Sequence, residues 1–128
     1  MGPEDGNTLS NGILLAERNT LFLQLWLKEY DNYNPDNWGY NALIVPFELS
    51  QKHPEMIHIE RDKLVNPTYN CRHQIFKMNF DWSENYTIHL YIRRFKSVFD
   101  ILSFRTMNNT LGAVTRYLLF GHKELCSA

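Results

Sequence analysis

The most regular pattern in the chain is the run Tyr-Thr-Ile-His-Leu-Tyr-Ile at positions 86–92. Apolar residues at alternate positions are typical of a half-buried β-strand, because successive side chains of a strand point to opposite faces. The pattern predicts that His89 points away from the apolar face, toward a cleft or solvent. A histidine placed in this way is either a functional group or an inert surface residue, and the spacing leaves both open.

Three shorter runs also predict strands. Residues 12–16, Gly-Ile-Leu-Leu-Ala, are apolar almost throughout, as expected of a short strand buried on both faces. Residues 56–60 alternate between apolar and polar, and residues 74–78 fit another small strand.

Helices are expected between and after these runs. Asn19 and Thr20 supply capping oxygens for a helix over residues 21–33, which ends before Pro35. Pro46 fits only the first turn of a helix, so a second helix is expected to start near Val45.

A third helix is expected at the end of the chain. Asn108 or Asn109 can cap it, and Gly121 can close it after Phe120. Strands separated by helices favour an α/β fold. A chain of 128 residues has room for one compact domain, so we expect residues 1–128 to form a single domain that begins with a loop over residues 1–10.

Composition and charge exclude several classes of function. Thirteen Lys and Arg residues against fourteen Asp and Glu residues give a net charge of −1, which provides no electrostatic basis for binding nucleic acid. The sequence contains neither an apolar run long enough for a membrane span nor an export signal. Cys71 and Cys126 permit one disulfide without requiring it, and Asn85 and Asn108 each begin a glycosylation sequon.

Common catalytic motifs do not occur. The five histidines form no HExxH pair, and Cys71-x-His73 supplies two zinc ligands where a structural site needs four. The sequence also lacks the glycine patterns of nucleotide-binding loops and the Gly-x-Ser-x-Gly elbow of serine hydrolases. These observations give no support to a zinc enzyme, a P-loop enzyme or a serine hydrolase.

The segment Asp36-Asn-Trp-Gly-Tyr-Asn41 places two aromatic rings and two side-chain amides in one predicted turn. Aromatic faces stack on the C–H surfaces of sugars, and amides bond sugar hydroxyls, so this composition suits a carbohydrate. The other interpretation is that Trp38 and Tyr40 cover the core. The segment Asp81-Trp82 before the predicted strand at 86–92 is the second informative place.

In this order, Asn11-Gly-Ile-Leu-Leu-Ala16, Trp38-Gly-Tyr-Asn41, Asp81-Trp82 and Tyr86-Thr-Ile-His89 resemble glycosyltransferases of the family 32 type, which carry the DXD sugar-binding region. The resemblance runs from about Asp5 to Tyr91. It implies a GT-A fold, a nucleotide-sugar donor, a divalent metal, usually Mn²⁺, and retention of the anomeric configuration. The expected fold class is therefore a partial GT-A-like mixed sheet flanked by helices.

The resemblance also implies roles for individual residues. Asn41 is the implied catalytic amide, facing the positive charge that develops on the sugar, and His89 is the implied metal ligand. The implied substrate-binding residues are Asn11, Trp38, Tyr40, Trp82 and Arg93. For Arg93, a bond to the donor phosphate and a solvated strand end remain equal alternatives.

The chain departs from the family in one respect that matters for function. It contains no Asp-x-Asp, and the resemblance starts just after the point where the family has that motif. We therefore expect the C-terminal half of a catalytic domain, which lacks the nucleotide-binding half and is able to pair with it. A fragment and a degenerate copy are both open, and activity of this chain alone is doubtful.

Two functions follow from these observations. The first is a Golgi-lumenal glycosyltransferase that transfers a hexose or N-acetylhexosamine from a nucleotide sugar to a glycan or glycolipid acceptor. The second is a non-catalytic carbohydrate-binding or interaction module.

Overall fold

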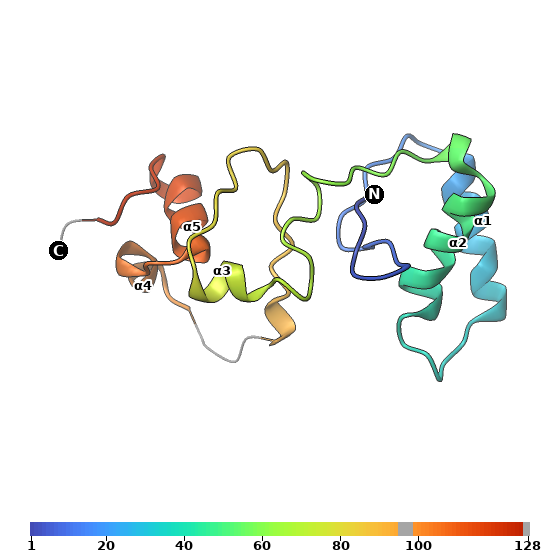
Figure 1. The fold of residues 1–128 in the computed structure, drawn as a ribbon, viewed down its shortest axis with the longest axis horizontal. Helices are drawn as coiled ribbons and strands as arrows, with labels where there is room; N and C mark the ends of the chain where they lie inside the picture. Colours follow the sequence, from blue (N-terminus) through green and yellow to red (C-terminus); the bar gives the residue numbers. More distant parts are fainter. Residues whose placement is uncertain (95–98, 127–128) are drawn as a thin grey trace. The chain divides into compact units, whose positions relative to one another are not determined.

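The computed structural model describes residues 1–94 and 99–126 and is built from helices and irregular segments (Figure 1). The chain divides into two compact units. Unit 1 comprises Met1–Thr68 and Asn85–His89, and unit 2 comprises Tyr69–Glu84 and Leu90–Ala128. Each unit is described by itself below.

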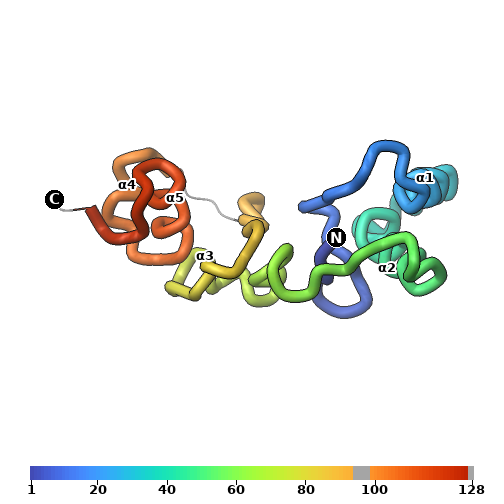
Figure 2. The backbone as a smooth tube through the Cα atoms, turned by 90° about the horizontal axis from the view of Figure 1, so that it is seen from above, coloured from blue at the N-terminus to red at the C-terminus, as the bar shows by residue number. Residues whose placement is uncertain are grey.

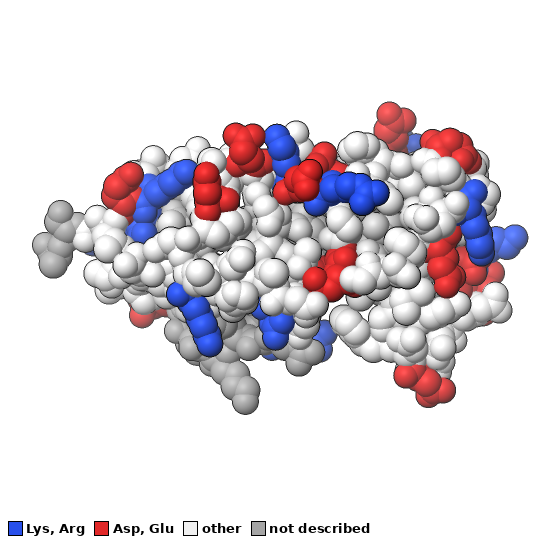
Figure 3. Space-filling model, in the orientation of Figure 1, with Lys and Arg blue, Asp and Glu red and all other residues white. Residues whose placement is uncertain are grey.

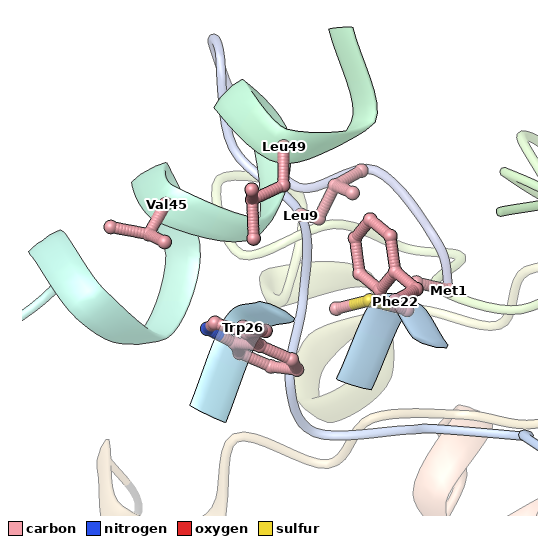
Figure 4. Close-up of a cluster of buried hydrophobic side chains, with 6 residues drawn as sticks. All are labelled: Met1, Leu9, Phe22, Trp26, Val45 and Leu49. Atoms are coloured by element: carbon pink, nitrogen blue, oxygen red, sulfur yellow. The ribbon is translucent and has the colours of Figure 1, made fainter. Parts of the chain in front are cut away.

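Unit 1 is organised by two short helices, α1 (Leu21–Lys28) and α2 (Val45–Lys52). A 3₁₀ turn, η1 (Glu29–Asn32), extends α1, and another, η3 (Pro54–Met56), follows α2. Apolar side chains from both helices and from the irregular N-terminal segment form the core shown in Figure 4, which consists of Met1, Leu9, Phe22, Trp26, Val45 and Leu49. The helix start predicted after Thr20 is confirmed, although the Thr20 side chain makes no capping bond.

A π-helical turn, η2 (Tyr40–Ile44), leads directly into α2. The carbonyl of Gly39 accepts hydrogen bonds from the amides of Leu43 at 2.8 Å and Ile44 at 3.3 Å, so this turn is wider than an α-helical one. Pro46 follows in the first turn of α2, which is the position predicted for it. The predicted helix start near residue 45 is therefore confirmed, whereas the π turn was not predicted.

Unit 2 contains α3 (His73–Lys77), the 3₁₀ turn η4 (Ile92–Arg94), α4 (Ile101–Thr106) and α5 (Thr110–Phe120). Helix α5 contacts both α3 and α4, and the backbone trace in Figure 2 follows α4 and α5 side by side. The caps predicted for the last helix are confirmed. The Asn109 side chain accepts from the Gly112 amide at 2.9 Å, and Gly121 ends the helix in the left-handed conformation at φ 79°.

A buried arginine fixes α5 to its surroundings. Arg116 is only 2% exposed, and its guanidinium donates to the carbonyls of Phe104 at 2.7 Å and Met107 at 2.8 Å. It also donates two bonds to the Lys123 carbonyl, at 3.0 and 2.8 Å. A buried charge needs such partners to offset the loss of hydration, so Arg116 organises the end of α4 and the segment after α5.

The expected α/β fold with a GT-A-like mixed sheet is wrong. Across residues 1–94 and 99–126 the structure is helical and forms no sheet, and the β-pairing it shows is one isolated antiparallel bridge between Pro3 and Leu9. The predicted strands at 12–16, 56–60, 74–78 and 86–92 are irregular or helical instead.

The segment 86–92 shows why the alternation misled. Its groups bond to one neighbouring loop: the Tyr86 amide donates to the Lys63 carbonyl at 2.8 Å, and the Thr87 hydroxyl donates to the Leu64 carbonyl. A side-chain hydroxyl thus takes the place of a ladder bond, so the extended chain packs one face without forming a sheet. Tyr91 then adopts φ 50°, which interrupts the extended conformation before η4 begins.

The other predicted strands fail for local reasons. In the run 12–16, Leu14 is 42% and Leu15 is 76% exposed, so this segment is not a buried strand. The segment 74–78 lies almost wholly in α3, whose carbonyls are bonded by the start of α5. The Asn109 side chain donates to the Phe76 carbonyl at 2.8 Å, and the Thr110 amide donates to the Met78 carbonyl at 2.8 Å. Tertiary partners, not local propensity, determine this helix.

Candidate functional site

The turn that connects η1 to η2 is held by one side-chain and one main-chain hydrogen bond. The Asn34 side chain accepts from the Asp36 amide at 3.0 Å, and the Tyr40 amide donates to the Asn37 carbonyl at 3.0 Å. These bonds fix the backbone around Trp38, because Asn and Asp stabilise turns by bonding main-chain groups two residues away. Trp38 itself is 77% exposed, so the turn presents an indole to solvent.

Asn41 anchors the same turn from beneath. It is 3% exposed, and its side-chain Oδ1 accepts from the Asn34 amide at 2.9 Å while Nδ2 donates to the Glu29 carbonyl at 3.1 Å. Its main-chain carbonyl accepts from the Trp26 indole N–H at 2.7 Å. Both polar atoms of the Asn41 amide are therefore engaged by the main chain, and the residue positions the turn.

The structure separates the two aromatic residues of this turn. Tyr40 is partly buried against the core of unit 1, which agrees with the interpretation that it covers the core. Trp38, at 77% exposure, does not cover the core. The sugar-stacking interpretation therefore rests on Trp38 alone.

His89 lies against Gly12, next to Asn11. A Cβ atom added to Gly12 would lie 2.7 Å from His89 Cε1 and 2.9 Å from Nδ1, so the ring approaches a position that only glycine permits. The Leu9 amide, three residues earlier, donates to the Leu43 carbonyl at 3.0 Å and connects this segment to η2. Unit 1 thus brings the Asn11-Gly12 pair and His89 together, whereas the Asn41 amide bonds to Glu29 and Asn34.

The described residues do not form a metal site by themselves. In the part of the chain that the structure describes, no three His, Cys, Asp or Glu side chains come close enough to hold a metal ion. The ring of His89, the implied ligand, packs on Gly12. A divalent ion needs several oxygen or nitrogen ligands at once, and the described residues do not bring such a set together.

Trp82 and Arg93 belong to unit 2. Trp82 is half-buried and lines a hollow of about 360 Å³ together with Asn79, Asp81 and Asn108. Arg93 is exposed in η4. The strand predicted to end near Arg93 is not formed, because residues 92–94 form η4 and Tyr91 before it adopts φ 50°.

Sequence reasoning missed three residues around Trp82. Lys123 Nζ lies 4.4 Å from the centre of the Trp82 ring, and the Tyr117 ring meets it edge-on at 5.5 Å between centroids. Arg116 lines the same hollow. A signal for Arg116 exists in the sequence, since it is the one charged residue in the otherwise uncharged helix at 110–120.

Asp81 is a carboxylate of this hollow whose pKa is lowered. Hydrogen bonds from Ser83, and to a lesser degree the positive charge of Lys123, hold the pKa of Asp81 below its usual value. The Ser83 amide donates to Asp81 Oδ1 at 2.9 Å. Asp81 is therefore an ionised hydrogen-bond acceptor at neutral pH.

Basic and acidic side chains are interspersed on the face shown in Figure 3. Cys71 and Cys126 are both free thiols. The helices within the described ranges all fall short of the length and apolar character that a membrane span requires.

Comparison with known proteins finds one curated relative to report. The chain is 23% identical over 83 residues to glucan organizing enzyme 1 of Cryptococcus neoformans var. grubii, and the match covers 57% of this chain. The chain spans about a quarter of the length of that relative, since the match covers 23% of it. No family model matches the chain, and no solved structure matches it.

Proposed function

We propose that this chain is part of a glycosyltransferase that transfers a hexose or N-acetylhexosamine from a nucleotide sugar to a glycan or glycolipid acceptor. The similarity to a protein named glucan organizing enzyme 1 supports a carbohydrate-related function. The ordered motifs of the family 32 type support the finer assignment. A Golgi-lumenal location of the whole enzyme is part of the same proposal.

The observation that carries the sugar-binding part is the exposed indole of Trp38. It is 77% exposed on a turn whose backbone is fixed by Asn34 and Asn41. An exposed aromatic ring loses little conformational freedom when a sugar stacks on it if its backbone is already held. Asn37, exposed in the same turn, supplies an amide for sugar hydroxyls.

The second sugar contact in unit 1 is the Asn11-Gly12 pair. Asn11 is exposed, so its amide is accessible to a donor sugar, and the His89 ring packs on Gly12 beside it. The imidazole next to that amide carries two ring nitrogens, a type of group that bonds diphosphate and hydroxyl groups. In this proposal the metal ligands of the whole enzyme come from residues outside the described set.

A second candidate is a non-catalytic carbohydrate-binding module, and Asn41 favours it. Both polar atoms of its amide bond to the main chain, at 2.9 and 3.1 Å. An amide engaged in this way positions the turn instead of facing a reacting carbon. The two candidates share the sugar contact at Trp38 and differ in whether a nucleotide sugar is bound.

The indole N–H signals of the ¹⁵N-labelled chain test the shared claim. The chain has three tryptophans, and the Trp26 indole is buried and bonded to the Asn41 carbonyl. On titration with a β-1,3-linked or an α-1,4-linked glucohexaose we expect the Trp38 signal to shift and the Trp26 signal to stay. The variant Trp38→Phe assigns the signal and keeps binding, whereas Trp38→Ala loses it.

A matched control removes an aliphatic side chain of similar exposure. Leu27, on α1, is 72% exposed, and Leu27→Ala should leave sugar binding unchanged. If the Trp38 signal stays fixed with both oligosaccharides, or if Trp38→Ala binds as the wild type does, the sugar-binding proposal is wrong.

Nucleotide-sugar titration separates the two candidates. Calorimetry with UDP-glucose and GDP-mannose, each with and without Mn²⁺, compares the wild type with His89→Ala. A glycosyltransferase requires heat of binding that His89→Ala reduces. Binding of glucohexaose without binding of either donor favours the carbohydrate-binding module and overturns the role of His89 in donor binding.

A further inference from the structure

We propose that unit 2 holds a second sugar-binding site, for a neutral hexose oligomer, in the hollow around Trp82. This inference rests on the proposed carbohydrate function and adds a site that is independent of the Trp38 turn. The hollow has a volume of about 360 Å³, which lies within the range of small-molecule sites. All residues that line it belong to unit 2.

The polar groups of the hollow are suited to hydroxyl groups. Asn79 Nδ2 donates to Asn108 Oδ1 at 2.9 Å, which orients the two exposed amides against each other. This bond uses one donor of Asn79 and one acceptor lone pair of Asn108, so the pair keeps an amide oxygen and an amide nitrogen for a ligand. A sugar hydroxyl both donates and accepts, and it can bond to both.

Asp81 adds a charged acceptor to this pair. Its lowered pKa keeps the carboxylate ionised, and one oxygen, Oδ1, is oriented by the Ser83 amide at 2.9 Å. Hydrogen bonds to an ionised acceptor are stronger than those between neutral groups. The other carboxylate oxygen can therefore accept from a hydroxyl of the bound sugar.

The charge of the lining selects a neutral ligand. Asp81 and Glu124 contribute two negative groups, and Arg116 and Lys123 contribute two positive groups. The guanidinium of Arg116 is already bonded to carbonyls of Phe104, Met107 and Lys123. A balanced lining gives no net attraction to an acidic sugar and favours an uncharged one.

Lys123 covers the aromatic surface in the free protein. Its Nζ lies 4.4 Å from the Trp82 ring centre, so a sugar that stacks on this face displaces the ammonium group. The main-chain carbonyl of Lys123 holds Arg116, but this contact does not depend on the side chain. Lys123→Ala therefore uncovers the indole without removing that anchor, and should tighten sugar binding about two- to fivefold.

The Trp82 indole signal tests the site in the full wild-type chain. We expect titration with neutral glucohexaose to shift the Trp82 signal, and an oligomer of galacturonic acid to shift it less at the same concentration. Trp82→Phe assigns the signal, and Trp82→Ala removes the second binding event while the Trp38 event persists. Helical circular dichroism confirms that each variant is folded.

The outcomes separate this inference from the function on which it rests. A Trp82 signal that stays fixed while Trp38 shifts overturns the second site and leaves the sugar-binding turn intact. A shift at Trp82 alone supports the second site and overturns the role of the turn. Tighter binding of the galacturonic acid oligomer overturns the assignment of a neutral ligand. Weaker binding of glucohexaose by Lys123→Ala overturns the assignment of Lys123 as the group that covers the Trp82 ring.

Discussion

Unit 1 and unit 2 each contain a buried polar side chain that bonds several main-chain groups, Asn41 in the first and Arg116 in the second, and the two differ in charge. In unit 1 the neutral amide of Asn41 bonds to the Asn34 amide and the Glu29 carbonyl. In unit 2 the guanidinium of Arg116 bonds to carbonyls of three residues. In these helical units the two side chains bond main-chain groups of separate segments, as the hydrogen bonds between strands do in a sheet.

The difference shows how charge suits each location. The Phe104 and Met107 carbonyls lie at the C-terminal end of α4, where helical carbonyls lack partners and carry partial negative charge. A cation fits there. The turn in unit 1 presents one donor and one acceptor, which an amide can match simultaneously.

The largest expected effect is that of Arg116→Met. Loss of the guanidinium leaves buried carbonyls without donors, and hydrogen bonds to charged groups are worth more than neutral ones. We expect the free energy of unfolding of unit 2 to fall by about 3 kcal/mol. Amide hydrogen exchange of α5, compared with that of α1, measures the loss unit by unit.

Lys77→Met is the matched control for Arg116→Met, because Lys77 is an exposed cation on α3. It should change the stability of unit 2 little. A loss below about 1 kcal/mol for Arg116→Met would show that the carbonyls find other partners.

Asn41→Ala is expected to have the next largest effect. It removes two hydrogen bonds beneath the turn and leaves a main-chain amide and carbonyl unpaired, so unit 1 should lose about 2 kcal/mol. Chemical denaturation followed by Trp26 fluorescence measures this loss, since the Trp26 indole bonds to the Asn41 carbonyl. Asn37→Ala, at an exposed position of the same turn, should cost much less.

The sequence predicted those elements whose signals are local. Asn109 and Gly121 mark the ends of α5, and Pro46 marks the start of α2, because capping and proline geometry depend on a few neighbouring residues. Helix α4 was missed, although Asp100 accepts from the Ser103 amide at 2.7 Å as an N-cap does. That signal was present in the sequence.

The elements that sequence reasoning assigned wrongly depend on distant partners. The alternation at 86–92 reports that one face packs, but not whether a neighbouring strand exists, and here a loop at 63–64 takes its place. The aromatic and amide composition at 36–41 left open whether the turn binds a sugar or covers the core. It could not show that Trp38 is exposed while Asn41 is buried and bonded beneath it.

The N-caps of α1 and α5 extend the comparison of the two units, with a smaller expected change in stability. Asn109 accepts from the Gly112 amide at 2.9 Å, whereas Thr20 makes no side-chain capping bond to α1. Asn109→Ala should therefore destabilise unit 2 by about 1 kcal/mol, and Thr20→Ala should destabilise unit 1 by a few tenths. Thermal unfolding of the two variants measures the difference. Equal losses would contradict the assigned capping geometry.

The smallest expected effect concerns two hydrogen-bonded carboxylates, one in each unit. Hydrogen bonds from Ser83 lower the pKa of Asp81, and a hydrogen bond from the Asp62 amide lowers the pKa of Glu60. A lowered folded-state pKa stabilises the protein above the unfolded pKa, and this stabilisation is lost as the pH falls through the folded value. Melting temperatures of Asp81→Asn and Glu60→Gln should lie slightly below wild type at pH 7 and converge with it below about pH 4.

The π turn at Tyr40–Ile44 makes the length of this segment a determinant of the surface above it. Removing one residue there would restore α-helical winding and rotate everything before it by about 100° about the helix axis. Asn41 would then leave the groups it bonds, and the indole of Trp38 would lose its fixed orientation. The orientation of the Trp38 loop about the helix axis thus depends on a single inserted residue. An insertion or deletion in this segment would therefore be tolerated far less than a substitution.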